Sequence, residues 1–351
     1  MCLSTTSTNY FTKDIIINPF SELFKQILYI LVGFILIFII KKLPQNVIRS
    51  FSLPVLFISL FLLVLVLVPG FYVSGIVNET GEIARRWLRM PLGFTIQPSE
   101  FAKLAIILFL ANYFSLIKKS IKLKHVLFSI ILIVIPAFLI FIEPNFSASV
   151  LFLIIGFIPI FIAGSKIAYL GIFTLPVIIG GVVLLIKSER LSSRFHSIFN
   201  VFSDPMNSGY QVLQSFIAIA KGNFFGSGFM KSSQKFYLLP ESQSDFVFSV
   251  ICEEFGLIGG FLIIIIFSML FISIIKVALL SKSYFDSILV TGIAAHIFIQ
   301  ASMHIGVTIG LFPPTGIPLP FLSTGGSAIL VNLCEIGLVC NVADRISTKV
   351  K

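Results

Sequence analysis

Two adjacent arginines beside a tryptophan are the first residues in this chain that could do chemistry. Arg85 and Arg86 precede Trp87, the only tryptophan of the sequence. Neighbouring guanidinium groups can clamp a phosphate through paired hydrogen bonds. The alternative is an interfacial anchor, in which Trp87 lies at the head-group layer of a membrane and the arginines extend toward water. The residues alone leave both interpretations open.

A second polar group, Gln97-Pro98-Ser99-Glu100 followed by Lys103, marks the start of a helix. Proline suits the first helical turn, and an acid there complements the positive end of the helix dipole. Glu100 is therefore a candidate cap. Because Lys103 follows Glu100 by three positions on the same helix face, we also expect the two to form an ion pair.

A carboxylate, Asp245, lies where the longest polar stretch ends and an apolar run begins. Burial at such a boundary raises the pKa of a carboxylate, which suits a general base. Aspartate is also a favoured helix N-cap, so both readings stay open. Further along the same run, Glu253 and Glu254 point in different directions, and we expect at least one to face a polar cavity.

Two further groups lie at the ends of apolar runs. Glu143-Pro144-Asn145 is either a simple interfacial turn or an acid that needs a partner. His304 precedes a stretch over 313–327 that contains Ser323 and is rich in proline and glycine. That stretch cannot be helical throughout, so it predicts a re-entrant or substrate-lining loop. A lone histidine such as His304 is more often structural than a ligand.

Apolar runs of membrane-spanning length position all these groups. The chain is 57% hydrophobic and only 11% charged, too few charges to coat a soluble protein of 351 residues. Runs of roughly 18–25 apolar residues span a hydrocarbon core as helices. We predict an all-α integral membrane protein with nine transmembrane helices, near 23–40, 51–68, 101–117, 126–142, 147–164, 168–186, 246–275, 287–312 and 328–342.

Short basic connections set the predicted orientation. Lysines and arginines follow the first, third, fifth, seventh and ninth runs, so that side is cytoplasmic. The net charge of +10 therefore points to a membrane surface as partner and not to nucleic acid. The opposite face carries most of the acidic residues and one large extracytoplasmic loop at about 187–245, which is long enough to be functional. We predict a single transmembrane domain over 1–351.

In this order the motifs resemble the SEDS family (shape, elongation, division and sporulation), which includes FtsW, RodA and SpoVE. The resemblance runs over nearly the whole chain from Gln26 onward. Its matching segments are Ala84-Arg-Arg-Trp87, Gln97-Pro-Ser-Glu100 with Lys103, Glu143-Pro144, Gly209-Tyr-Gln211, Gly226-Ser-Gly228, Leu239-Pro-Glu241 through Asp245, Glu253-Glu254 with Gly256, and Leu319-Pro with Gly325-Gly-Ser327.

The resemblance implies a peptidoglycan glycosyltransferase that polymerises lipid II by inverting transfer, with undecaprenyl pyrophosphate as the leaving group. It implies that Asp245 activates the acceptor hydroxyl, and that a divalent cation, Mg²⁺ or Mn²⁺, assists. The implied substrate-binding residues are Arg85, Arg86, Trp87, Gln97, Ser99, Glu100, Lys103, Lys235, Glu241 and Ser323. The implied partners are the growing glycan strand, a class B penicillin-binding protein and other division proteins, at the septum of the bacterial cytoplasmic membrane.

Some positions depart from the family pattern. Asn145, Lys221, Gln243 and Thr324 replace the usual Asp, Gly, His and Tyr, but Asp245 is retained. The segment Gln234-Lys235 and Asp204-Pro205 favour the division branch, FtsW, over the elongation polymerase RodA. Family members have ten spans, so the resemblance implies that the first is missing here, as a late start or a truncation would produce. A lipid II transporter and a non-catalytic division scaffold are the competing hypotheses.

Overall fold

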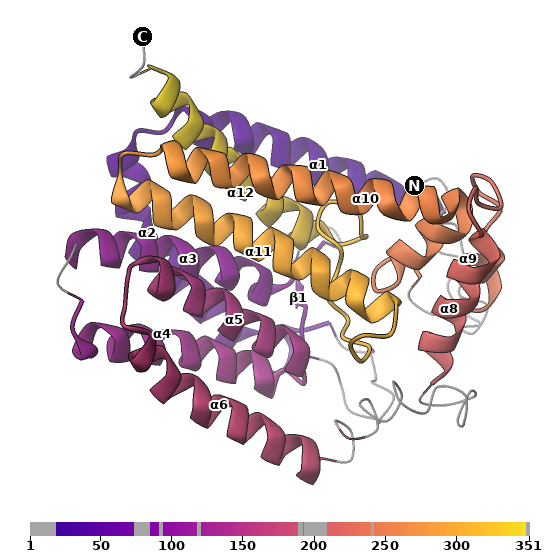
Figure 1. Cartoon of the computed structure of the whole chain (residues 1–351), viewed down its shortest axis with the longest axis horizontal. Coiled ribbons are helices and arrows are strands. Elements are labelled where there is room, and N and C mark those ends of the chain that lie inside the picture. The colour runs from indigo at the N-terminus through magenta and orange to yellow at the C-terminus, as the bar shows by residue number, and fades with distance from the viewer. Residues whose placement is uncertain are drawn as a thin grey trace. The chain divides into compact units, whose positions relative to one another are not determined.

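The computed structural model describes residues 19–73, 85–90, 94–117, 121–188, 192, 209–239 and 242–348. Within these residues nearly all regular structure is helical (Figure 1). The helices are α1 (Pro19–Lys42), α2 (Gln45–Leu65), α3 (Pro98–Ile117), α4 (Leu123–Ile142), α5 (Phe146–Ile162), α6 (Ile167–Lys187), α8 (Tyr210–Gly222), α9 (Ser233–Tyr237), α10 (Val247–Leu280), α11 (Tyr284–Thr308) and α12 (Gly326–Thr348).

The chain is a multi-pass membrane protein, as its composition predicts. Among the described residues, seven helices are long and apolar enough to cross a membrane: most of α1, together with α2, α3, α4, α10, α11 and α12. Helix α5 is apolar but shorter. Phenylalanines such as Phe38 on α1 and Phe61 on α2 are 64% exposed. Exposed apolar side chains of this size are expected where a helix faces lipid.

The contacts divide the chain into two compact units. We call Val32–Val182, Phe271–Ile297 and Ser327–Lys351 the bundle unit. We call Met1–Leu31, Val183–Leu270 and Phe298–Gly326 the loop unit, because it includes the stretch predicted as the large outer loop. Where that stretch is described after residue 192, it forms α8 and α9.

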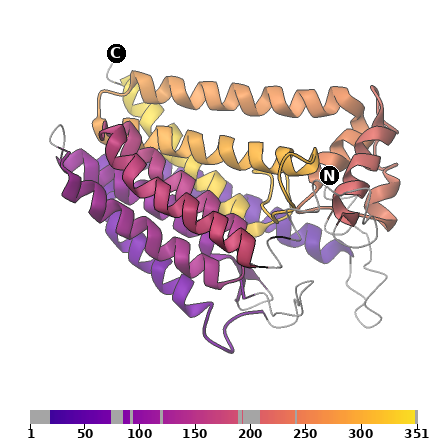
Figure 2. The same ribbon diagram turned by 60° about the horizontal axis from the view of Figure 1, so that its bottom comes forward.

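Helix α3 is the central helix of the bundle unit. It packs against α2 and α5, while α5 also packs against α4, and these helices lie side by side in both views (Figures 1 and 2). Phe114 and Leu110 on α3 are fully buried. Close approach of α4 and α5 depends on Gly156, since a Cβ there would lie 2.7 Å from Ile133. Small residues commonly allow this approach between membrane helices.

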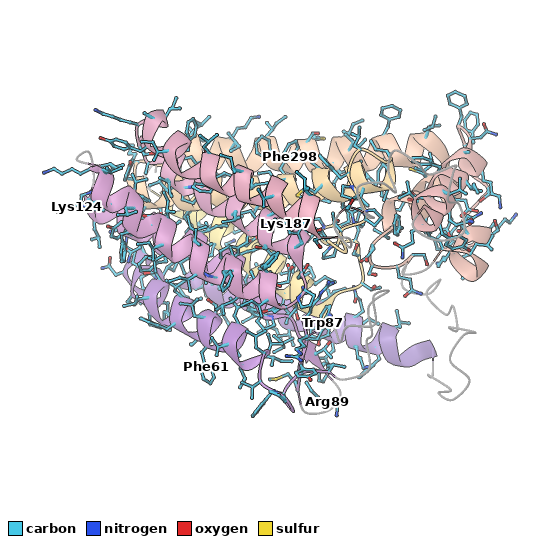
Figure 3. All side chains as sticks on the ribbon, turned by 90° about the horizontal axis from the view of Figure 1, so that it is seen from below. Phe61, Trp87, Arg89, Lys124, Lys187 and Phe298 are labelled. Atoms are coloured by element: carbon cyan, nitrogen blue, oxygen red, sulfur yellow. The ribbon has the colours of Figure 1, made fainter. Side chains whose placement is uncertain are left out.

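The two ends of this helix group differ in chemistry. Figure 3 shows Lys124 at one end and Trp87 with Arg89 at the other. We call these the basic end and the tryptophan end. At the tryptophan end a two-stranded antiparallel ladder pairs β1 (Leu88–Arg89) with β2 (Thr95–Ile96) immediately before α3. The sequence gives no period-2 signal for strands this short.

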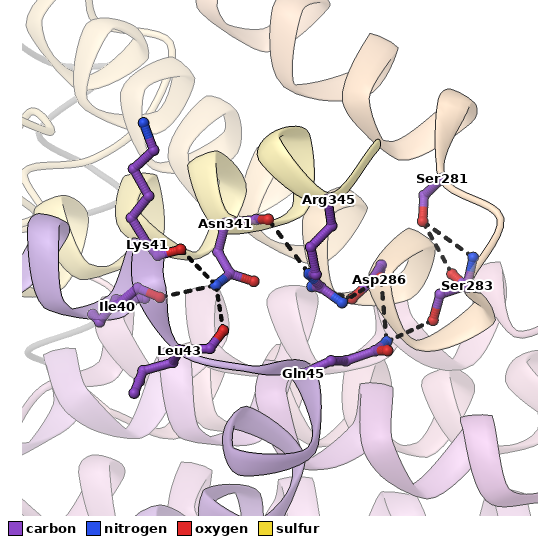
Figure 4. Close-up of polar contacts among 9 residues, drawn as sticks. All are labelled: Ile40, Lys41, Leu43, Gln45, Ser281, Ser283, Asp286, Asn341 and Arg345. Atoms are coloured by element: carbon purple, nitrogen blue, oxygen red, sulfur yellow. Dashed lines mark hydrogen bonds and ion pairs between the residues drawn. The ribbon is translucent and has the colours of Figure 1, made fainter. Parts of the chain in front are cut away.

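A polar network ties the bundle unit together on the side of α12's C-terminal turns (Figure 4). Arg345 donates two hydrogen bonds, of 2.8 and 3.0 Å, to the carboxylate of Asp286, which also accepts from Gln45. Asn341 donates to the backbone carbonyls of Ile40, Lys41 and Leu43. These bonds fix the α1–α2 turn against α12, and bidentate charged pairs are among the stronger hydrogen bonds in proteins.

Candidate functional site

The arginine pair of the bundle unit is held by the backbone around the β1–β2 ladder. The backbone N–H of Val73 donates to the Trp87 carbonyl, and Arg89 N–H donates to that of Phe71. Arg85 lies over the ring of Tyr72, with 5.4 Å from its guanidinium carbon to the ring centroid. Arg86 donates to the carbonyl of Pro144 at the end of α4. Both arginines and Trp87 are half-buried, so the segment is fixed by the protein but still accessible.

The start of α3 confirms the predicted ion pair. The helix begins at Pro98, and Lys103 Nζ lies 2.8 Å from Glu100 Oε2, with both side chains about 4% exposed. Because each charge compensates the other in a buried position, the pair presents little net charge to a ligand. The Gln97 N–H donates to Ser327 Oγ at 3.0 Å. The hydroxyl of Ser99 is buried and has no hydrogen-bond partner among the described residues.

In the loop unit, Asp245 ends a turn over residues 242–245, directly before α10. The first α10 amides bond the carbonyl of Phe246, so Asp245 precedes the residue at the cap position. Asp245 is half-buried, whereas Phe246 is 1% exposed and packs with Leu239 and Val307. The carboxylate therefore stands beside a rigid apolar anchor.

Ser323 holds this turn from the proline-rich stretch. Its hydroxyl donates to the Ser244 carbonyl at 2.7 Å and accepts from the Leu319 N–H at 2.8 Å. A parallel contact joins the Thr324 N–H to the Gln243 carbonyl at 3.1 Å. The chain is non-helical from residue 309 to 325, as its prolines predict. At 2% exposure, Ser323 is buried and supports the backbone next to Asp245.

Glu253 is the anchor of α9, a role that sequence reasoning missed. Its carboxylate accepts from the hydroxyl of Ser232, from Ser233 N–H at 3.0 Å and from Gln234 N–H at 3.4 Å. An acid at a helix N-terminus is favourable, and this one fixes the segment that carries Lys235. Lys235 itself is 5% exposed. Glu241, the remaining predicted site residue of this segment, lies outside the described residues.

Two histidines occupy buried structural positions. His304 Nδ1 lies 2.9 Å from the carbonyl of Ile317, which favours the structural interpretation of that residue. His296, which the sequence does not single out, lies 2.7 Å from Glu335, and both side chains are 0% exposed. An acid inside an apolar run needs a partner, so Glu335 was the available signal, but only the fold identifies that partner.

The described residues do not fit a preformed metal centre. Within them, no three His, Cys, Asp or Glu side chains gather closely enough to hold an ion. Magnesium is often held by one or two carboxylates with substrate phosphates, an arrangement that needs no such cage.

The fold and these sites define a polytopic membrane protein with charged groups at one end of its bundle unit and a braced carboxylate in its loop unit. The chain belongs to the SEDS family, since the family described as "Cell cycle protein", FtsW/RodA/SpoVE, matches residues 1–348. This confirms the resemblance expected from the motifs.

Two relatives and two solved structures illustrate the similarity. The chain is 38% identical over 321 residues to "Stage V sporulation protein E" of Bacillus subtilis, covering 91% of this chain and 86% of that protein. It is 36% identical to "Probable peptidoglycan glycosyltransferase FtsW" of Geobacter sp. strain M18, covering 93% and 88%.

Among solved structures, a peptidoglycan synthase complex that coordinates polymerisation and crosslinking contains a chain with a TM-score of 0.74 and 26% identity. The match covers 93% of this chain and 90% of that one. The rod shape determining protein RodA of Thermus thermophilus aligns with a TM-score of 0.66 at 24% identity, over 92% and 88%, which shows the same fold.

Proposed function

We propose that this protein is a peptidoglycan glycosyltransferase that polymerises lipid II. A hydroxyl of the acceptor sugar attacks the anomeric carbon of a lipid-linked donor. The new glycosidic C–O bond forms as the bond to undecaprenyl pyrophosphate breaks, with inversion. The leaving group keeps the electron pair, and the acceptor proton passes to a protein base. Family membership and the relatives named as glycosyltransferases support this proposal.

The observation that carries the proposal is the braced Asp245 turn. Asp245 is half-buried and stands beside a fully buried phenylalanine, while Ser323 fixes the carbonyl that precedes it. A general base must be held within hydrogen-bond reach of the proton that it removes, and a rigid turn meets that requirement. Asp245 therefore acts as the base, and Ser323 and the Gln243–Thr324 contact position it.

The cations act on the leaving group. Arg85 and Arg86 are half-buried at the tryptophan end and offer guanidinium groups to the pyrophosphate, whose negative charge grows as the donor bond breaks. Trp87 contacts the lipid-linked part. The surface that meets the substrate at this end also includes residues at the start of α3, namely Gln97, Ser99, Glu100 and Lys103. Lys103 acts mainly through its ion pair with Glu100. In the loop unit, the proposed substrate-binding residues are Lys235 and Glu241.

We further propose nine membrane spans, with α5 and α6 added to the seven helices of sufficient length and apolarity. The protein would lie in the bacterial cytoplasmic membrane at the division septum. A class B penicillin-binding protein is the proposed partner, because a similar chain is part of a complex that joins polymerisation to crosslinking. We favour the division role, with sporulation as the alternative that the Bacillus relative suggests.

The test uses the full chain in lipid nanodiscs with its cognate penicillin-binding protein and fluorescent lipid II. Wild type should produce long glycan strands on a gel, and Asp245→Asn should produce none. Asp344→Asn, at an exposed ion pair with Lys41, is the matched control and should polymerise normally. Equal product from wild type and Asp245→Asn would refute the role of Asp245. Movement of lipid II across the bilayer of proteoliposomes, without polymer, would instead identify a transporter.

A further inference from the structure

Glu143 is a buried acid at the tryptophan end, and it has no role in the reaction proposed above. It directly follows α4, its residue is 0% exposed, and neither carboxyl oxygen has a hydrogen-bond partner among the described residues. An ionised carboxylate in such a position would cost several kcal/mol unless it were paired. This rules out the simple exposed turn that the sequence left open. The side chain needs either a proton or a cation.

Arg86 is the cation next to it. Its guanidinium donates to the carbonyl of Pro144, the residue after Glu143. Burial raises the pKa of Glu143 to about 9, although the positive charge of Arg86 opposes the rise. The carboxyl group is therefore protonated and neutral at physiological pH. Arg86 therefore meets a neutral neighbour at this position.

Among the described residues, few other charges influence this carboxyl group. The second half of α4 and the first half of α5 carry no ionisable side chain, and Arg49 lies near the opposite end of α2. On α3, Glu100 and Lys103 compensate each other in their ion pair. Arg85 lies over the Tyr72 ring, and Arg89 is exposed. The electrostatic partner that matters most to Glu143 is Arg86.

We propose that Glu143 is a proton-bearing positioning residue that couples proton binding to phosphate binding at Arg86. When Glu143 is protonated, Arg86 can direct its charge at a pyrophosphate. When Glu143 is ionised, it attracts the guanidinium and repels the anion. By linkage, a bound anion must in turn strengthen the hold of Glu143 on its proton. The inference rests on the proposed function, in which Arg86 meets the pyrophosphate of a lipid-linked sugar.

Infrared difference spectroscopy reads the protonation of Glu143 directly. The full chain is placed in nanodiscs of zwitterionic lipid, and the band of the protonated carboxyl group is followed as pH rises through about 9. The band should be absent in Glu143→Gln and retained in Glu335→Gln, a matched acid-to-amide change at another fully buried position. Persistence of the band in Glu143→Gln would overturn the assignment.

Adding undecaprenyl pyrophosphate tests the coupling. It should displace the titration upward by about one unit, which corresponds to a tenfold stronger binding of the anion to the protonated form. Arg86→Gln should abolish that displacement, and Arg86→Lys should retain part of it. An unmoved titration, or a full displacement in Arg86→Gln, would overturn the proposal. The same displacement with phosphatidylglycerol alone, or with sulfate alone, would overturn the assignment to a lipid-linked pyrophosphate.

Polymerisation is measured separately, so that the two proposals can fail independently. The wild-type rate should fall above the Glu143 titration, whereas Glu143→Gln should keep its rate there, because its amide cannot ionise. If no variant polymerises lipid II but the carboxyl titration still responds to the lipid pyrophosphate, the coupling stands and the proposed reaction fails. A rate profile in Glu143→Gln that falls as in wild type would refute the coupling during turnover.

Discussion

Replacing Ser323 by alanine should loosen the turn that carries Asp245. The substitution removes a 2.7 Å hydrogen bond to the Ser244 carbonyl and a 2.8 Å bond from the Leu319 N–H. Each bond contributes about 1 kcal/mol net, and leaving buried backbone groups unpaired costs more, so we expect a loss of about 2–4 kcal/mol. Because a base displaced by about 1 Å can lose 10²-fold in rate, polymerisation should fall by about 10- to 100-fold.

Rate and stability are measured together on the full chain in nanodiscs. Ser302→Ala is the matched control, since that exposed hydroxyl bonds only its own helix, at the Phe298 carbonyl. It should leave both quantities within experimental error. Ser323→Thr keeps a hydroxyl and should restore most of the activity lost in Ser323→Ala. If Ser323→Ala polymerised lipid II as fast as Ser302→Ala, the argument that Ser323 positions Asp245 would be wrong.

Three further predictions concern stability and are checked by thermal unfolding in detergent. Gly226→Ala should misfold or strongly destabilise the loop unit, because φ is +83° and a Cβ would lie 2.1 Å from the Glu254 carbonyl oxygen; Gly171→Ala, with open space, is its control. Asp286→Asn should cost about 1–3 kcal/mol by breaking the buried pair with Arg345, while Asp344→Asn should cost under about 0.5 kcal/mol. The raised pKa of Glu143 means that folding favours its protonated form. Its contribution to stability is therefore full below pH 4.5 and is lost as pH rises toward about 9, at roughly 1.4 kcal/mol per pH unit. Glu143→Gln should remove that dependence, and an equal pH dependence in both proteins would contradict the prediction.

The sequence predicted those features of the structure that depend on residues close to one another in the chain. The start of α3 at Pro98 and the ion pair of Glu100 with Lys103 follow from helix geometry, because the partners are one turn apart. The membrane-spanning helices follow from apolar length. The proline content correctly predicted a non-helical stretch after α11, whereas the role that the family motifs imply for Asp245 stays a prediction.

Contacts between distant segments were not predictable in the same way. Glu253 reads in sequence as a costly acid in an apolar run, yet it caps α9, which precedes it in the chain. His296 gave no signal, because only the packing of α11 beside α12 shows that it meets Glu335. The N-terminal part of α10 also differs from a simple span. Gly256 has a φ of +70° and interrupts the helix, and no hydropathy pattern indicates where that break falls.

The break at Gly256 is bonded by the segment that joins α8 to α9. A broken membrane helix leaves carbonyls that need donors. Here the N–H groups of Ser227 and Gly228 bond the carbonyls of Glu253 and Glu254, and the Leu257 N–H bonds back to Asn223. The first turns of α10 are therefore held at both ends. The N–H groups of Ser227 and Gly228 hold the end near Glu253. Ser323 holds the Ser244 carbonyl just before the helix begins. Asp245 owes its position to contacts within the loop unit, whereas Arg86 and Glu143 are held within the bundle unit.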